Sequence, residues 1–192
     1  MPNIFVRYRA WWIALVAIVA AHLLDGWGWD HLYRDGVYEH DLGRLLRIIG
    51  YLPFWLLAGI ALWLQTRNRR RGLMLALVPT LSGLVAEVMK ILLRRERPKL
   101  HDGAYFFRPF SDQFWSTRDI GLPSSHALVA FGGAWLLCRF WPRAWPIWLG
   151  LAAGCALTRV QSQAHFISDV TVGAAAAYAV VAWAWRFEKR EG

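Results

Sequence analysis

Six long apolar runs, separated by short polar stretches, are the feature that most restricts how this chain can fold. They cover about residues 11–24, 48–64, 72–93, 127–141, 145–157 and 170–185. Each run is continuous rather than alternating in polarity, which is typical of transmembrane helices. Several runs are shorter than the ~20 residues that cross a bilayer, so we expect these helices to extend into flanking polar residues. The pattern predicts an all-α, polytopic membrane helical bundle of about six transmembrane helices.

Composition supports a single membrane domain over residues 1–192. Hydrophobic residues make up 57% of the chain, and the net charge is +9. The basic residues cluster between apolar runs, so we predict membrane lipids as partners and no nucleic acid. Cys138 and Cys155 fall inside runs and are interpreted as packing residues, and the spacing of Gly150 and Gly154 favours close helix packing. The sequence carries no signature of an oligomeric state.

Charge alone does not fix the orientation, because Lys and Arg are equally divided between the two sets of connections. If Lys90, Arg97 and Arg159 bind a ligand, they no longer count as topology signals. The remaining Lys and Arg residues then favour the side of the termini, which places both termini in the cytoplasm and residues 25–47, 94–126 and 158–169 outside. We therefore predict an integral protein of the bacterial inner membrane. The first run, with Arg7 and Arg9 ahead of it, also resembles a signal peptide, but we prefer a retained span.

Three groups of polar residues flank the apolar runs, at residues 90–98, 123–126 and 158–169. The first group ends the third run, the second begins the fourth, and the third joins the fifth to the sixth. Successive helices alternate in direction across a membrane. All three groups are therefore expected on the same side, whether or not the first span is retained.

The first group suits the binding of a phosphate. Lys90 and Arg97 are two helical turns apart, about 10 Å along the axis, and their cationic donors match phosphate oxygens. Pro98 then ends or kinks the helix. Lys90 lies within an apolar run, where a charge is costly and usually functional. Arg94 and Arg95 are interpreted instead as a basic patch at the membrane surface.

The other two groups supply an anion cradle and two histidines. Ser124 is a favoured helix N-cap, and the free N–H groups of the first turn bind anions. His126, at the same point, can donate a proton to a leaving oxygen. If the segment from His165 to Asp169 is helical, both side chains share one face, so the carboxylate can hold one imidazole nitrogen and leave the other free to attack. Arg159 is placed to bind the same anion.

Together these residues resemble the three motifs of the type-2 phosphatidic acid phosphatase family, which shares its catalytic core with the vanadium haloperoxidases. The family patterns are K-x6-R-P, P-S-G-H and S-R-x5-H-x3-D. Here they are present as Lys90 through Arg97-Pro98, as Pro123-Ser124-Ser125-His126, and as Thr158-Arg159 through His165 to Asp169. The motif core covers residues 90–169, and the helix pattern extends the resemblance over the whole chain.

The resemblance implies a membrane enzyme that hydrolyses a lipid phosphate or diphosphate without a metal or other cofactor. His165 would attack phosphorus in line and form a phosphohistidine, Asp169 would orient it, and His126 would protonate the leaving oxygen. The non-bridging oxygens would be held by Lys90, Arg97, Ser124, Ser125 and Arg159.

Two positions depart from the family pattern. Ser125 stands where glycine is usual, and Thr158 where serine is usual. Glycine permits close approach of the backbone to phosphate, so Ser125 is expected to change the rate or the substrate range. Thr158 keeps a hydroxyl.

Several alternatives remain open at this point. Undecaprenyl diphosphate, phosphatidylglycerol phosphate, phosphatidic acid and lipid A phosphates are all candidate substrates, of which we favour a polyprenyl diphosphate. A non-catalytic membrane protein that binds or transports lipid phosphates needs the same cations. An intramembrane serine protease needs a G-x-S-G-like serine within a helix, which residues 121–124 do not supply. A second site for a metal is not favoured, because no regular ligand spacing links His22, Asp25, His31 and His40.

Overall fold

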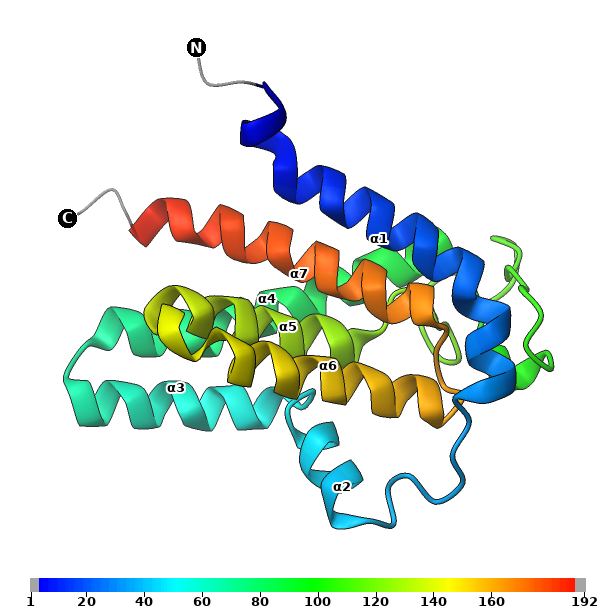
Figure 1. The fold of residues 1–192 in the computed structure, drawn as a ribbon, viewed down its shortest axis with the longest axis horizontal. Helices are drawn as coiled ribbons and strands as arrows, with labels where there is room; N and C mark the ends of the chain where they lie inside the picture. Colours follow the sequence, from blue (N-terminus) through cyan, green and yellow to red (C-terminus); the bar gives the residue numbers. More distant parts are fainter. Residues whose placement is uncertain (1–3, 189–192) are drawn as a thin grey trace.

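The computed structural model describes residues 4–188, which form a bundle of helices (Figure 1). Within these residues the only extended pairing is two isolated bridges in the connection before α5. The prediction of an all-α bundle is confirmed. The helices are α1 (Ile4–His31), α2 (Asp41–Ile48), α3 (Leu52–Thr66), α4 (Arg69–Leu93), α5 (Ser125–Phe140), α6 (Trp145–Gln161) and α7 (Ile167–Glu188), with short 3₁₀ turns η1 (Pro98–Leu100) and η2 (Pro142–Ala144).

The long helices follow the predicted apolar runs, but not all of them are long enough to span a membrane alone. Helices α1, α4 and α7 meet the length and hydropathy expected of a span, and α2 with α3, bent by 67°, counts as a fourth. Helices α5 and α6 have only 16 and 17 residues, fewer than the ~20 that cross a bilayer. The structure shows an integral membrane protein, and the count of six crossings stays a prediction.

The predicted meeting of the three polar groups occurs at one end of the bundle. Helix α4 ends there, α5 begins, α6 ends and α7 begins, beside the C-terminal end of α1 (Figure 1). Helix α1 packs along α7, and the backbone N–H of Ser168 donates to Asp25 of α1 at 2.8 Å. This contact ties α1 to the start of α7, and retention of the first span stays a prediction.

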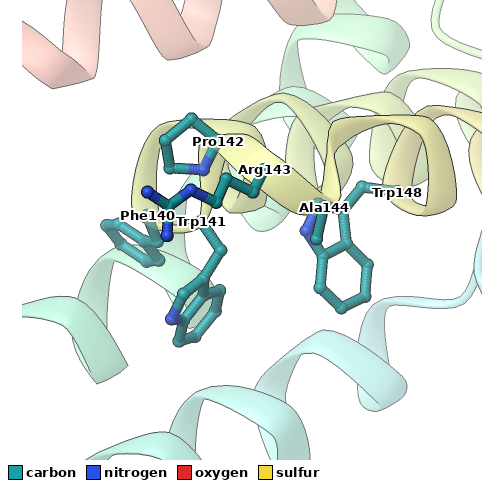
Figure 2. Close-up of a pocket in the computed structure, with 6 residues that line it drawn as sticks. All are labelled: Phe140, Trp141, Pro142, Arg143, Ala144 and Trp148. Atoms are coloured by element: carbon teal, nitrogen blue, oxygen red, sulfur yellow. The ribbon is translucent and has the colours of Figure 1, made fainter.

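The opposite end of the bundle carries a surface hollow at the turn between α5 and α6. Its lining is mainly aromatic, with one cation, and Figure 2 shows these side chains around η2: Phe140, Trp141, Pro142, Arg143, Ala144 and Trp148. Trp and Arg at helix ends are typical of a membrane interface. Because α5 runs from the polar groups to this turn, the hollow lies a whole helix away from them and takes no part in the candidate site.

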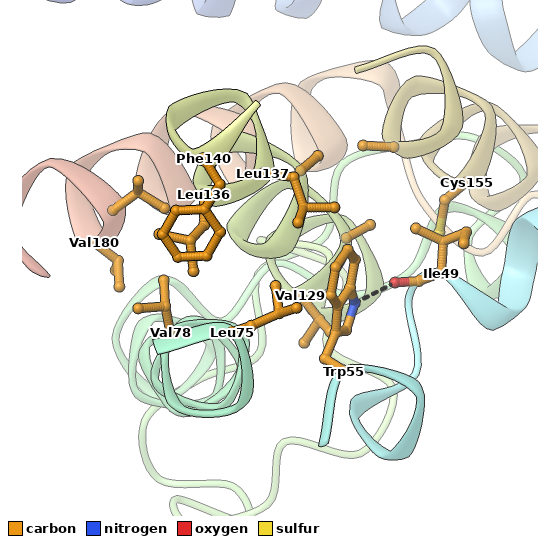
Figure 3. Close-up of a cluster of buried hydrophobic side chains, with 14 residues drawn as sticks. Ile49, Trp55, Leu75, Val78, Val129, Leu136, Leu137, Phe140, Cys155 and Val180 are labelled. Atoms are coloured by element: carbon orange, nitrogen blue, oxygen red, sulfur yellow. Dashed lines mark hydrogen bonds between the residues drawn. The ribbon is translucent and has the colours of Figure 1, made fainter. Parts of the chain in front are cut away.

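The core includes Trp55 at the start of α3 (Figure 3). Its indole N–H donates to the carbonyl oxygen of Ile49 at 2.8 Å, which fixes the bend between α2 and α3. Its ring lies against Gly133 of α5, where an added Cβ would come within 2.3 Å of the ring. Helix α5 is central, since it packs against α4, α6 and α7, so its first turn is held rigidly at the polar end.

Close approach of two backbones joins α3 to α4. A Cβ at Gly72 would lie 2.7 Å from the Gly59 carbonyl oxygen, and one at Gly59 would lie 2.6 Å from the Gly72 carbonyl oxygen. The prediction of close packing at Gly150 is wrong, because nothing lies within 4 Å of its Cβ position. Gly154 instead accommodates the side chain of Leu46 from α2.

Replacing Gly72 with alanine should therefore destabilise the bundle, while the same change at Gly150 should not. Overpacking against a backbone oxygen costs about 1–3 kcal/mol, whereas alanine in open helix surface gains up to about 1 kcal/mol over glycine. Thermal unfolding of both purified variants in the same detergent measures the difference. Equal midpoints for Gly72→Ala and Gly150→Ala would contradict this packing.

Candidate active site

His165 lies in the connection between α6 and α7 and is 4% exposed. Its Nδ1 is 2.8 Å from the carbonyl oxygen of Gly121. A carbonyl can only accept a hydrogen bond, so this geometry assigns the ring proton to Nδ1 and leaves the lone pair on Nε2. Burial lowers the pKa of His165 to about 4, with Arg159 and Arg97 acting in the same direction and Asp169 against it. The imidazole is therefore neutral and nucleophilic near pH 7.

Asp169 contacts this imidazole less directly than the sequence predicts. Its Oδ2 is 3.6 Å from His165 Nδ1, which is longer than a hydrogen bond. The same oxygen accepts from the backbone N–H of Phe166 at 2.8 Å. The Gly121 carbonyl therefore fixes the tautomer, and Asp169 holds the chain beside the ring. The expected direct hydrogen bond is corrected to this arrangement.

Arg95 is a buried partner of Asp169, not part of a basic patch at the membrane surface. It is 1% exposed, and its guanidinium donates to Asp169 Oδ1 at 2.5 Å and to Ser168 Oγ at 2.6 Å. Asp25 of α1 lies 4.0 Å away. The predicted patch is wrong because the chain turns at the end of α4 and directs this side chain inward, between two carboxylates that neutralise it.

Arg94 is buried as well, at 2% exposed. It is in the left-handed conformation, with φ of 54°, and ends α4. Its guanidinium donates to the carbonyl oxygens of Arg108, Pro109 and Phe114 at 2.8–3.1 Å. Five donors on one planar group suit this task. Arg94 thus organises the connection between α4 and α5, which the surface-patch interpretation did not anticipate.

Lys90 and Ser125 share one carboxylate, that of Glu87. Lys90 Nζ donates to Glu87 Oε1 at 2.9 Å, and the Ser125 hydroxyl donates to the same oxygen at 2.7 Å. Ser124 forms the predicted N-cap of α5, because its side-chain oxygen accepts a hydrogen bond from the backbone N–H of Ala127, three residues later. The hydroxyl that replaces the usual glycine hydrogen is thus directed to Glu87.

Among the buried nitrogen atoms that have no hydrogen-bond partner within residues 4–188 are three on motif residues that the sequence analysis assigned to the site: Nε of Arg97, Nε of Arg159 and Nε2 of His126. Buried polar atoms usually have partners. The charges of Arg97 and Arg159 both act on His165, so these groups face one region. Cationic donors that converge beside a neutral imidazole fit an oxyanion whose central atom the imidazole attacks.

Residues 32–51 supply site residues that the sequence analysis did not assign. Arg159 donates to the Tyr38 hydroxyl at 3.0 Å, and that hydroxyl donates to the Thr158 carbonyl oxygen at 3.1 Å. The ring of Tyr51 meets the ring of His126 edge-on, with centroids 5.1 Å apart. These contacts join residues more than a hundred positions apart in one case, so no local spacing could reveal them. Glu87, three residues before Lys90, was detectable as a helical neighbour.

The histidines near the start of the chain serve local contacts. Among the described residues no group of three His, Cys, Asp or Glu side chains could hold a metal. His22 and His31 contact the carbonyl oxygens one helical turn before them. Asp25 is engaged by Ser168 and by the Tyr105 hydroxyl, at 2.5 Å from the latter. Burial and the contact with Asp25 raise the pKa of Tyr105 to about 12, so it remains a donor.

The chain is similar in sequence and in fold to known membrane proteins. The sequence model of the PAP2 superfamily matches residues 71–192. The chain is 25% identical over 151 residues to the bacitracin transport permease protein BcrC of Bacillus licheniformis, covering 71% of this chain and 70% of that protein. It is also similar to the crystal structure of a transmembrane PAP2 type phosphatidylglycerolphosphate phosphatase from Bacillus subtilis, with a TM-score of 0.69 over 98% of both chains at 18% identity.

Loss of the buried Arg95 guanidinium should unfold the candidate site. Removing one partner of a buried ion pair costs about 3–5 kcal/mol, because the remaining charge stays buried without compensation. Arg95→Gln should therefore lower the thermal midpoint in detergent strongly. Arg118→Gln, at a side chain 88% exposed on the same connection, is the matched control and should leave the midpoint unchanged. A stable Arg95→Gln protein would show that Arg95 is not paired as described.

Proposed function

Because the chain belongs to the PAP2 superfamily, we propose that it is a membrane phosphatase that hydrolyses a lipid phosphate or diphosphate. The observation that carries the proposal is the neutral imidazole of His165, whose Nδ1 faces the Gly121 carbonyl oxygen and whose ring lies within the electrostatic influence of Arg97 and Arg159. The two relatives support it, since one is a phosphatase of phosphatidylglycerolphosphate and the other is also a bacterial membrane protein by its name.

The proposed reaction has two steps. In the first, Nε2 of His165 forms a bond to phosphorus, the bond from phosphorus to the leaving oxygen breaks, and that oxygen takes a proton from His126. In the second, water attacks the phosphorus of the phosphohistidine and gives a proton to His126, which restores the proton lost in the first step, and the N–P bond breaks to release inorganic phosphate and restore the imidazole of His165. Nδ1 keeps its proton on the Gly121 carbonyl throughout.

The non-bridging oxygens of the phosphate would be held by groups from all three motifs. Arg97 and Arg159 supply planar donors, and Lys90 supplies a compact charge that Glu87 now shares. Ser124 and the N–H groups of Ser125 and His126 would complete the cradle at the start of α5. Stabilisation of charge at preorganised donors is the main source of catalysis in phosphoryl transfer. No metal is required by this donor set.

A lipid tail would leave the site along an apolar groove. Small and branched apolar side chains line it between α6 and α7, and it reaches from Ile167, two residues after His165, toward the middle of both helices. We place this end of the bundle on the outer face of the bacterial inner membrane, with both termini in the cytoplasm. Of the four candidate substrates we favour a polyprenyl diphosphate such as undecaprenyl diphosphate.

A transporter that binds lipid phosphates without hydrolysis is the second candidate function, because the relative from Bacillus licheniformis is named a transport permease. A transporter would need the cations at the site but would not need a free imidazole nitrogen. Phosphate release by the purified protein separates the two functions.

The purified protein should release inorganic phosphate from a panel of lipid phosphates in detergent with EDTA present. His165→Ala should lower the rate by at least about 10³-fold, because no nucleophile remains. Release that depends on added metal, or that persists in His165→Ala, would count against the mechanism.

Arginine at position 159 should not be replaceable by lysine. Arg159 binds Tyr38 and faces the phosphate with one planar fork, which an ammonium cannot imitate. We expect Arg159→Lys to lower kcat/KM by about 10–100-fold. Arg118→Lys, a change of the same kind at an exposed side chain, should have no effect. Equal losses in both variants would mean that Arg159 does not bind the phosphate as proposed.

The serine that replaces the usual glycine should be dispensable. Ser125→Gly keeps the backbone N–H that faces phosphate and removes only the hydroxyl bonded to Glu87. Phosphate release should therefore stay within about tenfold of the wild type, since one hydrogen bond is worth about 0.5–1.5 kcal/mol. Complete loss of activity would show that the Ser125 hydroxyl takes a direct part in the reaction.

A further inference from the structure

Arg47, near the end of α2, is a cation that none of the three motifs contains. Its guanidinium lies over the ring of Tyr38, 4.6 Å from the centroid, and near the ring of Tyr51 at 5.5 Å. Its Nε is buried and has no hydrogen-bond partner within the described residues. An arginine held by two aromatic faces is fixed in place while its N–H donors stay available.

The same two tyrosines connect Arg47 to the candidate active site. Tyr38 accepts a hydrogen bond from Arg159 at 3.0 Å, and Tyr51 contacts the ring of His126. Arg47 and His126 therefore contact the same ring, that of Tyr51. His126 is the histidine that would protonate the leaving oxygen in the proposed reaction.

The main-chain environment keeps this segment in position. Gly50 lies so close to His126 that an added Cβ would come within 2.9 Å of its side chain. Residues 32–40 are tied to the end of α6, because the backbone N–H of Arg34 donates to the Gln161 carbonyl oxygen at 3.1 Å. Gly43 of α2 packs on the Val37 carbonyl oxygen, with no room for a Cβ. These contacts hold the backbone around Arg47 in a fixed position.

We propose that Arg47, with Tyr38 and Tyr51, forms a binding site for the second phosphate group of a lipid diphosphate. The proposal rests on the function proposed above and names the substrate class of that site. The terminal phosphate would lie between His165 and the cations Arg97 and Arg159, and the phosphate that stays on the lipid would lie against Arg47.

The chemistry of the leaving group explains why a cation belongs there. Hydrolysis of a lipid monophosphate expels an alcohol, which needs a proton but carries no charge. Hydrolysis of a diphosphate breaks the bond between the terminal phosphorus and the bridging oxygen, and the electron pair stays on a lipid monophosphate. That group is a stable anion near pH 7, since its second pKa is about 6. A fixed guanidinium stabilises the added negative charge as it develops.

The charges around Arg47 support the assignment. Glu87 neutralises Lys90 within the site, and Asp41 on the same short helix pairs with Arg44 instead. No ion pair of Arg47 with a carboxylate is found among residues 4–188, and its contacts are with aromatic rings. Its positive charge is therefore available to an anionic group of the substrate.

The test compares farnesyl diphosphate with farnesyl monophosphate, which share one tail, as substrates in detergent with EDTA. Arg47→Gln should lower kcat/KM for the diphosphate by at least about tenfold and for the monophosphate by less than about threefold. Arg47→Lys, which keeps the charge but loses the planar donors, should give an intermediate ratio. Arg118→Gln is the control for loss of an exposed cation and should leave both substrates unchanged.

A second measurement uses methylenediphosphonate and inorganic phosphate as inhibitors of monophosphate hydrolysis. The Arg47→Lys protein should bind the diphosphonate more weakly than the wild type does and should bind phosphate equally well. Equal losses of kcat/KM on both substrates would overturn the proposal, because they indicate a purely structural role for Arg47. Values of kcat/KM in the Arg47 variants that equal those of the wild type would overturn it too. A wild-type protein that hydrolyses only the monophosphate overturns this inference alone, whereas one that hydrolyses neither overturns the proposed function with it.

Discussion

The buried guanidinium of Arg95 is the interaction on which the geometry of the site depends. Its side chain joins Asp169 of α7 to Asp25 of α1, and its carbonyl oxygen accepts from the Gly121 N–H at 2.7 Å. The Gly121 carbonyl oxygen in turn accepts a hydrogen bond from the Nδ1–H of His165. Burying ions costs several kcal/mol each unless every lone pair is satisfied, and here donors from Ser168, Tyr105 and Phe166 satisfy both carboxylates. Arg95 thus holds in place both the Gly121 carbonyl and the Asp169 carboxylate, the two groups beside the Nδ1 of His165.

In the proposed reaction, Glu87 would lower the affinity of the site for its phosphate product. A phosphate dianion would be bound strongly by Lys90, Arg97 and Arg159 together. The carboxylate of Glu87 competes for Lys90, so part of that attraction is offset before any ligand enters. Ser125 donates to the same carboxylate, which gives its hydroxyl a partner and keeps it turned away from the phosphate position. The departure from glycine is therefore accommodated by a residue one helix away.

The sequence predicted what depends on local spacing and failed where distant segments decide. Apolar runs located the helices, and motif spacing located His165 and Asp169, because both signals repeat over a few residues. Arg94 and Arg95 were misjudged because their burial follows from a left-handed turn at a residue that is not glycine. Asp25 could not be paired with Ser168 for a different reason: the two lie 143 positions apart. Physical contacts of this kind leave no local pattern.

The family match covers only part of the chain, and the residues before it bear on which substrate the site would accept. The family match begins at residue 71, and all the groups of the proposed reaction lie after that point. Tyr38, Arg47 and Tyr51 precede it, yet they contact Arg159 and His126. In the proposed reaction these residues would lie beside the leaving group, whereas His165 is contacted by Gly121 and Asp169, which are outside residues 32–51. Changes in this segment would therefore act on the leaving group through Arg159 and His126, and not on the nucleophile itself.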